Sequence, residues 1–319
     1  MVWPTSEWPI ALPPAGFDTG LVDVVADVAF GAPDAAARLR SIVVVHGGAI
    51  VYERYHPLDG PDTVFESYSV AKSVTATLTG MLADDGVLDP DAPAPVPEWQ
   101  GAGDARAAIT LDDLLRMSSG LEWRESFAPD DVVWQMLQAE HAADVPIAQP
   151  LVHEPGTVWN YSTGTSAIIA DVLADALGGP DALDRFIRER LMAPLGIRST
   201  EIGTDGTGTY YGGLGFDSTA RDFARFGLLH LRGGLWDGRR LLSEAWIDRV
   251  RLPSAGNERY GAHWWLLGPD DTFSAQGLFG QQIVVDVAHD LVVVATATAG
   301  GDSRTVVSEV LRQFDARSP

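Results

Sequence analysis

The sequence predicts an α/β protein whose antiparallel sheet is flanked by helices from both ends of the chain and interrupted by an inserted all-α domain. Strand-like runs lie near both ends, at 41–54 and 260–296, whereas helical periodicity dominates between them. Short turns connect the strand-like runs, and such turns suit antiparallel neighbours rather than βαβ crossovers. We therefore expect residues 1–68 and 215–319 to form one sheet domain together, and residues 69–214 to form a mainly helical domain.

The N-terminal part of the chain predicts one helix and one hairpin. Residues 17–30 carry apolar side chains at helical spacing, which predicts a helix whose buried face includes Leu21 and Val28. Two β-rich runs then meet at a pair of glycines, so residues 41–54 are expected to form a β-hairpin.

Helical patterns fill the centre of the chain, and strands return toward its end. Polar residues suited to N-caps, such as Thr110, Thr219 and Ser243, mark expected helix starts. The expected helices span approximately residues 70–82, 110–118, 164–177, 181–191, 219–231 and 243–250. Strands are expected at 260–267, 282–287 and 291–296, followed by a last helix carrying Val306, Val310 and Phe314.

The charge balance of the chain is strongly acidic, with 44 Asp and Glu against 22 Lys and Arg and a formal net charge of −22 at pH 7. A surface of this sign repels phosphate, so neither a nucleic-acid partner nor attachment to an anionic membrane is expected. The acidic surplus has two interpretations: an ordinary solvated surface, or adaptation to high salt, where self-repulsion is screened. The chain has no Cys, which excludes disulfides, thiol nucleophiles and Cys-ligated metals.

Targeting signals and the common cofactor motifs are missing from the sequence. The sequence contains no run of about 20 apolar residues, so no transmembrane helix is expected. Residues 1–16 also lack the pattern of a signal peptide, so we expect a cytoplasmic protein. The sequence has no H-E-x-x-H, no glycine-rich phosphate loop and no G-x-S-x-G. We therefore expect no metal and no cofactor, and a small molecule as the partner.

The candidate chemistry centres on Ser69 and Lys72. All 22 basic residues except Lys72 are arginine, and arginine cannot act as a base because its guanidinium does not lose a proton. Ser69 falls at a predicted helix start and Lys72 three residues later, so both side chains share one helical face. An amine whose pKa is lowered can activate the hydroxyl as a nucleophile. The alternative is that Lys72 is an ordinary surface residue.

Two further segments supply candidate partners. Tyr161 lies in a turn before a helix and is a candidate for passing a proton to the leaving group, with a half-buried core tyrosine as the alternative. The run Gly277-Leu-Phe-Gly280-Gln281 leads into a predicted strand. Glycines there let a substrate approach the backbone, and a backbone N–H can join that of Ser69 in holding an oxyanion. An ordinary bulge is the alternative for this run.

Taken in this order, the segments resemble the serine β-lactamase and penicillin-recognising family. The nearest likeness is to its class C-like branch of esterases, D-aminopeptidases and 6-aminohexanoate-dimer hydrolases. The resemblance covers roughly residues 17–315 and implies a β-lactamase-like fold, with the active site in a cleft between the sheet domain and the all-α domain. The segments that carry it are Ser69-Val-Ala-Lys72, Tyr161-Ser-Thr163, the run 277–281, and the stretches 114–121, 154–156 and 219–227.

The resemblance also implies a role for each candidate. Ser69 is then the acylated nucleophile, Lys72 its proton acceptor and Tyr161 the second proton-transfer residue. The backbone N–H groups of Ser69 and Gln281 form the oxyanion hole. Expected substrate-binding residues are Thr163, Gly280, Trp159, Tyr210 and Tyr211, the aromatic ones as walls of an acyl pocket or simply as core.

The chain departs from the family pattern at two points. Thr163 replaces the Asn of the usual Tyr-x-Asn motif, and one hydroxyl cannot reproduce the separate donor and acceptor groups of a carboxamide. Leu278-Phe279-Gly280 stands where a Lys or His usually begins the third motif, so it offers no cation to a β-lactam carboxylate. Both changes favour an esterase or small amidase over a true β-lactamase or transpeptidase.

The expected function is therefore a serine hydrolase that cleaves a carboxylic ester or small amide through an acyl-enzyme on Ser69. One alternative within the enzyme class is an amidase that acts on 6-aminohexanoate-like oligomers or D-aminoacyl peptides. An alternative from another class is a catalytically silent binding or sensor protein that has kept the fold.

Overall fold

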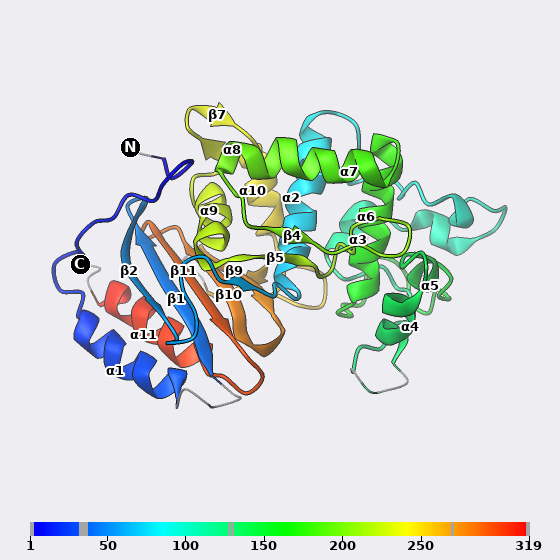
Figure 1. Cartoon of the computed structure of the whole chain (residues 1–319). Helices are drawn as coiled ribbons and strands as arrows, with labels where there is room; N and C mark the ends of the chain where they lie inside the picture. Colours follow the sequence, from blue (N-terminus) through cyan, green and yellow to red (C-terminus); the bar gives the residue numbers. More distant parts are fainter. Residues whose placement is uncertain (1–2, 32–37, 127, 129–130, 269–270, 317–319) are drawn as a thin grey trace.

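The central feature of the computed structural model is a six-stranded antiparallel sheet of order β2-β1-β11-β10-β9-β8 (Figure 1). The structure describes residues 3–31, 38–126, 128, 131–268 and 271–316. Strand β1 pairs with β11, so the two ends of the chain complete one sheet, as the sequence predicts. The strands are β1 (Leu39–His46), β2 (Ala49–Tyr55), β8 (Trp265–Leu266), β9 (Thr272–Gly277), β10 (Gln281–Asp286) and β11 (Leu291–Ala297).

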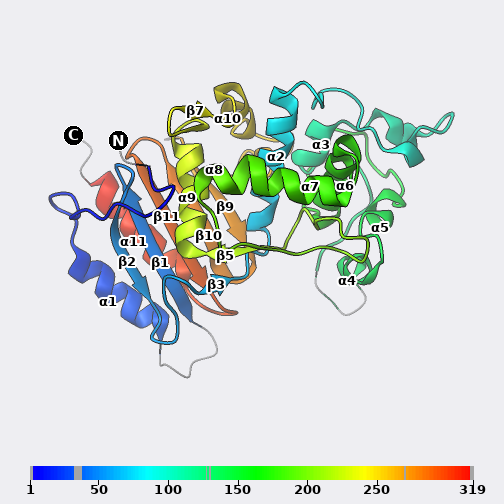
Figure 2. The same ribbon diagram turned by 45° about the horizontal axis from the view of Figure 1, so that its top comes forward.

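Helices cover both faces of this sheet (Figures 1 and 2). Helices α1 (Thr19–Phe30) and α11 (Ser303–Asp315) pack on one face, and α9 (Ala220–Leu231) packs on the other. Successive side chains of a strand point to opposite faces. Accordingly, Ile42 belongs to the cluster under α1 and α11, whereas its neighbour Val43 belongs to the larger cluster on the α9 side.

Helix α1 buries a face that overlaps the predicted one only in part, since Val25 and Ala29 of the predicted pattern pack against the core. Leu21 and Val28 are 39% and 81% exposed, and the buried residues are Val22, Ala26 and Phe30. Because apolar residues surround most of this helix, periodicity cannot choose between adjacent faces. The sheet contacts the face whose residues recur every four positions.

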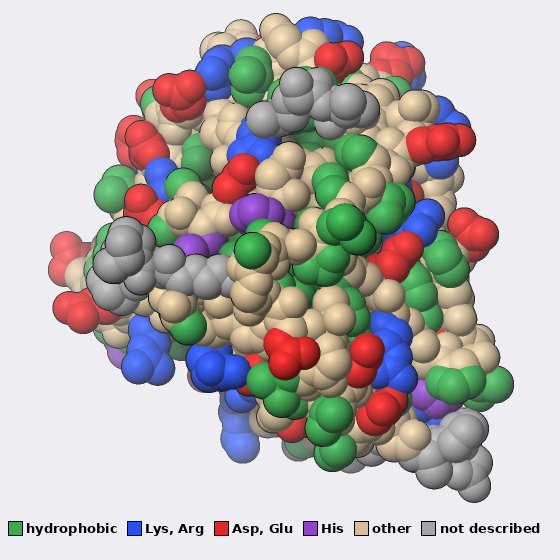
Figure 3. Space-filling view, turned by 90° about the vertical axis from the view of Figure 1, so that its left-hand side faces the viewer, with side chains coloured by type: hydrophobic (Ala, Val, Ile, Leu, Met, Phe, Trp, Pro, Cys, Tyr) green, Lys and Arg blue, Asp and Glu red, His purple; other side chains and the backbone are tan. Residues whose placement is uncertain are grey.

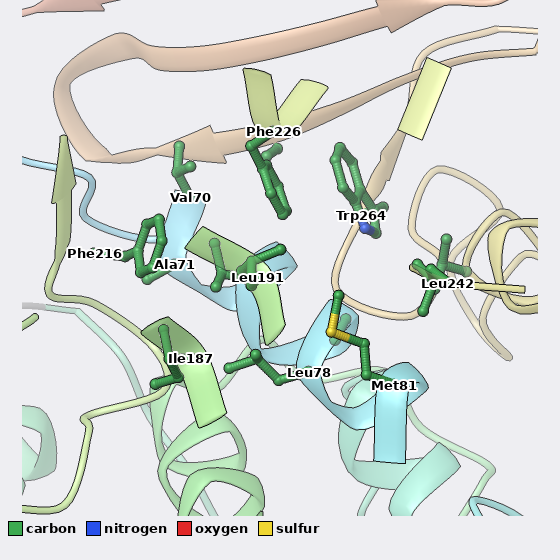
Figure 4. Packing of buried hydrophobic residues seen from close by; sticks show 14 of the residues in the cluster. Val70, Ala71, Leu78, Met81, Ile187, Leu191, Phe216, Phe226, Leu242 and Trp264 are labelled. Carbon is green, nitrogen blue, oxygen red and sulfur yellow. The ribbon is translucent and has the colours of Figure 1, made fainter. Parts of the chain in front are cut away.

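Helix α2 (Val70–Asp84) runs through the middle of the molecule, and its residues from Val70 to Leu82 are all buried. Figure 4 shows its side chains among those of the surrounding segments, including Ile187, Phe226 and Trp264. The other helices are α3 (Leu111–Leu115), α4 (Val132–Gln138), α5 (Asp144–Ile147), α6 (Thr163–Leu177), α7 (Pro180–Phe186), α8 (Ala193–Leu195) and α10 (Glu244–Val250), with a π-helical turn at Ile187–Met192.

The predicted helix caps are confirmed. Thr110 and Asp113 form a capping box at the start of α3, and the side chains of Thr219 and Ser243 accept backbone N–H bonds at the starts of α9 and α10. These side chains satisfy N–H groups that the first helical turn leaves without a partner.

The predicted strand at 260–267 is largely wrong. Only Trp265–Leu266 forms a strand there, because the preceding backbone is irregular: His263 has φ +60°, and a Cβ on Gly261 would lie 2.0 Å from the carbonyl oxygen of Val250. Strand β9 was not predicted. The run 277–281 leads into a strand as predicted, because Gln281 begins β10, but Gly277 ends β9 and residues 278–280 form the tight turn between the two strands, with Phe279 at φ +64°.

Two small sheets complete the fold. One contains β3 (Val64–Phe65), β5 (Phe216–Thr219) and β4 (Glu201–Ile202), and the other contains β6 (Leu235–Trp236) and β7 (Arg239–Arg240). The pairing of β3 with β5 joins the segment before Ser69 to the segment after residue 213. One continuous apolar cluster includes residues of both the sheet and the central helices, and the domain boundaries expected from the sequence stay a prediction.

The surface that carries α1 and α11 mixes charges of both signs with apolar side chains (Figure 3). Arg54 of β2, for example, pairs with Asp23 and Asp27 of α1. Exposed pairs of this kind contribute little to stability individually. Within the described ranges, no helix has both the length and the apolar character that crossing a membrane requires.

Candidate active site

Ser69 stands at the start of α2 with its side chain free of any capping hydrogen bond. The residue before it, Tyr68, has φ +44°, a conformation that is rare for residues with a side chain and that turns the backbone sharply into the helix. One residue earlier, the hydroxyl and the backbone N–H of Ser67 both donate to the carboxylate of Asp217. The Ser69 hydroxyl is thus held at the helix start, where it accepts a hydrogen bond from Lys72 Nζ at 3.0 Å.

Lys72 is almost completely buried, at 1% exposure, and its ammonium has three acceptors. These are Ser69 Oγ at 3.0 Å, Thr163 Oγ1 at 2.9 Å and the carbonyl oxygen of Gly213 at 3.1 Å. Burial lowers the pKa of Lys72 to about 8, and the carboxylate of Glu125 partly opposes that shift. Gly213 must be glycine, because a Cβ there would lie 2.7 Å from the Thr163 methyl group.

Tyr161 lies beside this pair, with its ring centroid 5.0 Å from Lys72 Nζ. Burial raises the pKa of Tyr161 well above its usual value, and a side-chain hydrogen bond with Ser69 offsets this only in part. Its ring stacks on Trp265 and contacts Tyr260 and Trp159. Tyr161 is therefore a neutral phenol near pH 7, a form that can donate a proton.

Glu125 is a member of the site that sequence reasoning missed. Its carboxylate accepts hydrogen bonds from Thr163 Oγ1 at 2.7 Å, from the Thr163 backbone N–H at 2.6 Å and from Trp123 Nε1 at 3.0 Å. It comes 38 positions before Thr163 in the chain, outside every motif that the sequence offers. Only the packing of its loop against the start of α6 brings it to the site.

Two pockets meet at Ser69. The first, here the polar pocket, has a volume of about 550 Å³, and its lining includes Tyr161, Glu125, Gln276 and Arg304. The second, here the apolar pocket, has a volume of about 440 Å³ and lies between α4 and the turn at 278–279. Its apolar lining residues are Val133, Trp134, Leu137, Leu214, Leu278 and Phe279.

The structure brings some of the expected binding residues to these pockets. Gly280 and Gln281 line the polar pocket and Thr163 lines the apolar one. The Gln281 side chain exchanges hydrogen bonds with the backbone of Ala297, and its backbone lies opposite Gly277 in the β9–β10 ladder.

The expected aromatic walls lie elsewhere. Trp159 sits in the cluster behind Tyr161, and Tyr210 is buried with its hydroxyl 3.3 Å from the carbonyl oxygen of Ala71. Tyr211 packs against a small core cluster that includes Trp123. None of the three is among the residues lining the two pockets. Trp134 and Trp265 provide the aromatic walls instead, because α4 and β8 reach the cleft.

A cation lines the polar pocket from an element outside the third motif. Arg304, near the start of α11, lines the polar pocket together with Asp302. Spacing along the sequence gave no sign of this, because α11 reaches the cleft only after the sheet has been completed by both ends of the chain.

Comparison with known proteins agrees with the fold. The sequence matches the beta-lactamase family over residues 32–316. It is 27% identical over 299 residues to the 6-aminohexanoate-dimer hydrolase of Paenarthrobacter ureafaciens, covering 82% of this chain and 74% of that protein. It is also 29% identical over 302 residues to penicillin-binding protein 4 of Amycolatopsis lactamdurans, covering 79% of this chain and 76% of that one.

Solved structures show the same fold. A family VIII carboxylesterase superposes with a TM-score of 0.73 at 19% identity, covering 95% of this chain and 99% of that one. A penicillin-binding protein homologue from Caulobacter crescentus gives a TM-score of 0.72 at 18% identity, covering 96% and 98%. The family match extends over most of the chain, so this protein belongs to the beta-lactamase family.

Proposed function

We propose that this protein is a serine hydrolase that cleaves a carboxylic ester or a small amide through an acyl-enzyme on Ser69. The observation that carries the proposal is the buried amine of Lys72 within hydrogen-bond distance of the Ser69 hydroxyl, with its pKa lowered to about 8. A base of that pKa is partly neutral near physiological pH and can therefore accept the hydroxyl proton.

In the proposed reaction, Ser69 Oγ transfers its proton to Lys72 Nζ as it forms a bond to the substrate carbonyl carbon. The carbonyl oxygen becomes an oxyanion held by the Ser69 backbone N–H and by a second N–H from the turn at 277–281. Gln281, expected from the sequence, and Leu278, which lines both pockets beside Ser69, are the candidates for that second donor. When the leaving group departs, it takes a proton from Tyr161, which lines the polar pocket and regains a proton from Lys72.

Deacylation repeats the sequence with water. Water gives a proton to the neutral amine of Lys72 and attacks the acyl carbon, and Ser69 Oγ then departs and regains a proton. The acyl group leaves as the carboxylic acid product, and the site returns to its starting state. Each proton taken from a nucleophile is thus returned to a leaving group within the same turnover.

The two pockets support an assignment of the substrate's halves. Tyr161, the proposed donor to the leaving group, lines the polar pocket, so the leaving group is assigned to that side of Ser69. The acyl group is then assigned to the apolar pocket. Trp134, Leu278 and Phe279 of that pocket are each 38% exposed, and clustered exposed apolar side chains are typical of a binding site.

The test of this function is turnover of p-nitrophenyl esters, together with mass spectrometry after exposure to a fluorophosphonate. We expect one covalent adduct on Ser69 and turnover that disappears in Ser69→Ala. Labelling without turnover would favour a sensor protein, and absence of labelling would favour a binding protein. The expected cytoplasmic location remains a prediction that cell fractionation can check.

A linear zwitterionic amide is the second candidate substrate, and the charges at the two pockets favour it. Arg304 provides a cation at the polar pocket, where Glu125 and Asp302 are also present. The described lining of the apolar pocket, in contrast, has the acidic side chains of Glu66 and Asp217 and no Lys or Arg. An acyl chain ending in an ammonium and a leaving group ending in a carboxylate would match these charges. The 6-aminohexanoate dimer has that form, and its hydrolysis alongside esters and nitrocefin distinguishes amidase, esterase and β-lactamase activity.

A further inference from the structure

We propose that Glu125 is a positioning residue that makes Lys72 present its lone pair to Ser69, acting through the hydroxyl of Thr163. This inference rests on the proposed function, because it concerns how the proposed base is oriented. It follows from the donors and acceptors available around one nitrogen atom.

The Thr163 hydroxyl has a single proton, and it donates that proton in a hydrogen bond to Glu125. Thr163 Oγ1 donates to Glu125 Oε1 at 2.7 Å, so toward Lys72 Nζ, 2.9 Å away, this oxygen can only accept. The carboxylate cannot rotate freely, because its other oxygen accepts from the Thr163 backbone N–H and from Trp123 Nε1. The direction of the Thr163 hydroxyl is thus fixed by three hydrogen bonds to Glu125.

A neutral lysine amine has two N–H donors and one lone pair. The carbonyl oxygen of Gly213, 3.1 Å from Nζ, also can only accept. Thr163 and Gly213 therefore accept hydrogen bonds from both N–H groups of the amine. The lone pair remains for the third neighbour, the Ser69 hydroxyl at 3.0 Å, and this is the orientation that proton abstraction requires.

Removal of the carboxylate would release this arrangement. A Thr163 hydroxyl without Glu125 can turn and donate its proton to the amine, and the lone pair is then occupied by the wrong partner. Thr163 stands where the family motif has an Asn, and its hydroxyl alone cannot act as a fixed acceptor toward Lys72. The carboxylate of Glu125 fixes the direction of that hydroxyl, so the Thr163–Glu125 pair presents the acceptor that the Asn carboxamide would otherwise contribute.

The charge of Glu125 acts on the same amine. It stabilises the ammonium and keeps the Lys72 pKa from falling further under burial. In the described part of the chain, the titratable groups that interact with Lys72 are Glu125, Tyr161 and His263. His263 is buried and its pKa is lowered to about 3, and the pKa of Tyr161 is raised, so both are neutral from pH 5 to 9. Among the three, Glu125 is the group whose charge raises the Lys72 pKa.

The single lysine of the chain allows a direct test. Selective labelling with ¹³C,¹⁵N-lysine gives one side-chain signal, whose titration reports the Lys72 pKa with no need for activity. We expect Glu125→Gln to lower this pKa by about one unit, since it removes a nearby opposite charge. Glu122→Gln, a matched change at an exposed glutamate on the same loop, should leave it unchanged. An unchanged or raised pKa in Glu125→Gln would overturn the proposal.

Kinetics test the orientation separately from the charge. Above the Lys72 pKa of every variant, kcat for p-nitrophenyl acetate should fall about 10-fold or more in Glu125→Gln and Thr163→Val, with little change in KM. Thr163→Ser, which keeps the hydroxyl, should retain most activity. Wild-type kcat in Glu125→Gln at that pH would refute the positioning role. A wild-type protein that neither turns over esters nor labels at Ser69 would instead refute the proposed function. In that case the NMR titration would still test whether Glu125 raises the pKa of Lys72, because it does not depend on activity.

Discussion

Lys72 Nζ lies 3.0 Å from Ser69 Oγ in a site where the lysine is almost fully buried. One turn of α2 sets this distance, because residues three positions apart lie on the same side of a helix. The rest of the protein sets the proton affinity of the amine. Burial favours its neutral form, and Glu125 limits the shift. The relationship links a local helical spacing to a property of the folded core.

The pH dependence of turnover follows from this pKa. The proposed base is active when neutral, so kcat/KM for a p-nitrophenyl ester should rise with pH and level off above an apparent pKa of about 8. Because esters hydrolyse spontaneously at high pH, the measurement needs a Ser69→Ala blank at each point. A profile that is flat from pH 6 to 9.5 would count against Lys72 as the base.

The replacement Lys72→Arg keeps the positive charge and removes the base. We expect kcat/KM to fall about 10³-fold, within the range that general base catalysis contributes. The control is Arg304→Lys, which makes the reverse exchange in the polar pocket at a residue assigned no role in proton transfer. Comparable ester turnover by wild type and Lys72→Arg would exclude the proposed mechanism.

The apolar pocket predicts a dependence on acyl chain length. With p-nitrophenyl acetate, butyrate and octanoate as substrates, Trp134→Ala should reduce kcat/KM for the octanoate about 10-fold and leave the acetate within about 2-fold, since a lost apolar contact costs roughly 1–3 kcal/mol. Trp265→Ala changes an aromatic wall of the other pocket and should not alter the preference for chain length. If Trp134→Ala affects all three esters equally, the acyl assignment is wrong.

Gly277 predicts a mechanical effect on the nucleophile. A Cβ at this position would lie 2.4 Å from the carbonyl oxygen of Ser67, two residues before Ser69. Gly277→Ala should push that segment away, displace the hydroxyl and lower kcat about 10-fold or more, because small errors in placement are costly in catalysis. Gly60→Ala, where a Cβ meets nothing within 4 Å, is the matched control. Equal kcat in the two variants would show that Ser69 tolerates the shift.

Much of this arrangement could be predicted from the sequence because its determinants are local. β-Rich runs and short turns predicted the antiparallel sheet, and polar cap residues predicted the starts of α3, α9 and α10. Ser69 and Lys72 could be identified from the sequence for the same reason, because their relation depends on helical spacing and on a composition with a single lysine.

The residues that sequence reasoning missed depend on long-range packing. Glu125 and Arg304 come from separate loops and helices, and nothing in the spacing places them beside Ser69. Trp159 and Tyr210 were expected in an acyl pocket, but aromatic side chains serve equally well as core, and only the fold decides which role each takes. The buried face of α1 could not be predicted either, because apolar residues lie on most sides of that helix and only the fold decides which side meets the sheet.

Two buried histidines predict how stability depends on acid. His263 and His230 are each 2% exposed, and burial lowers their pKa values to about 3 and about 4. Their unfolded forms titrate near 6.5, so between these values the unfolded state binds more protons, and the free energy of unfolding falls as the pH drops below 6.5. The loss at each site should be on the order of 3 kcal/mol near pH 4.

Urea unfolding of wild type and His263→Asn at pH 7, 6, 5 and 4 measures this effect. The variant should be less stable at pH 7, because His263 hydrogen-bonds Leu115 and Ser166 there, but its stability should decline less steeply with acid. His141→Gln provides a contrast of opposite sign. Burial lowers the pKa of His141, but the hydrogen bonds and ion pairs with Asp144 and Asp171 together outweigh burial and raise it, so its contribution is present at low pH and lost as the pH rises. Parallel curves for wild type and His263→Asn would show that His263 does not drive the acid sensitivity.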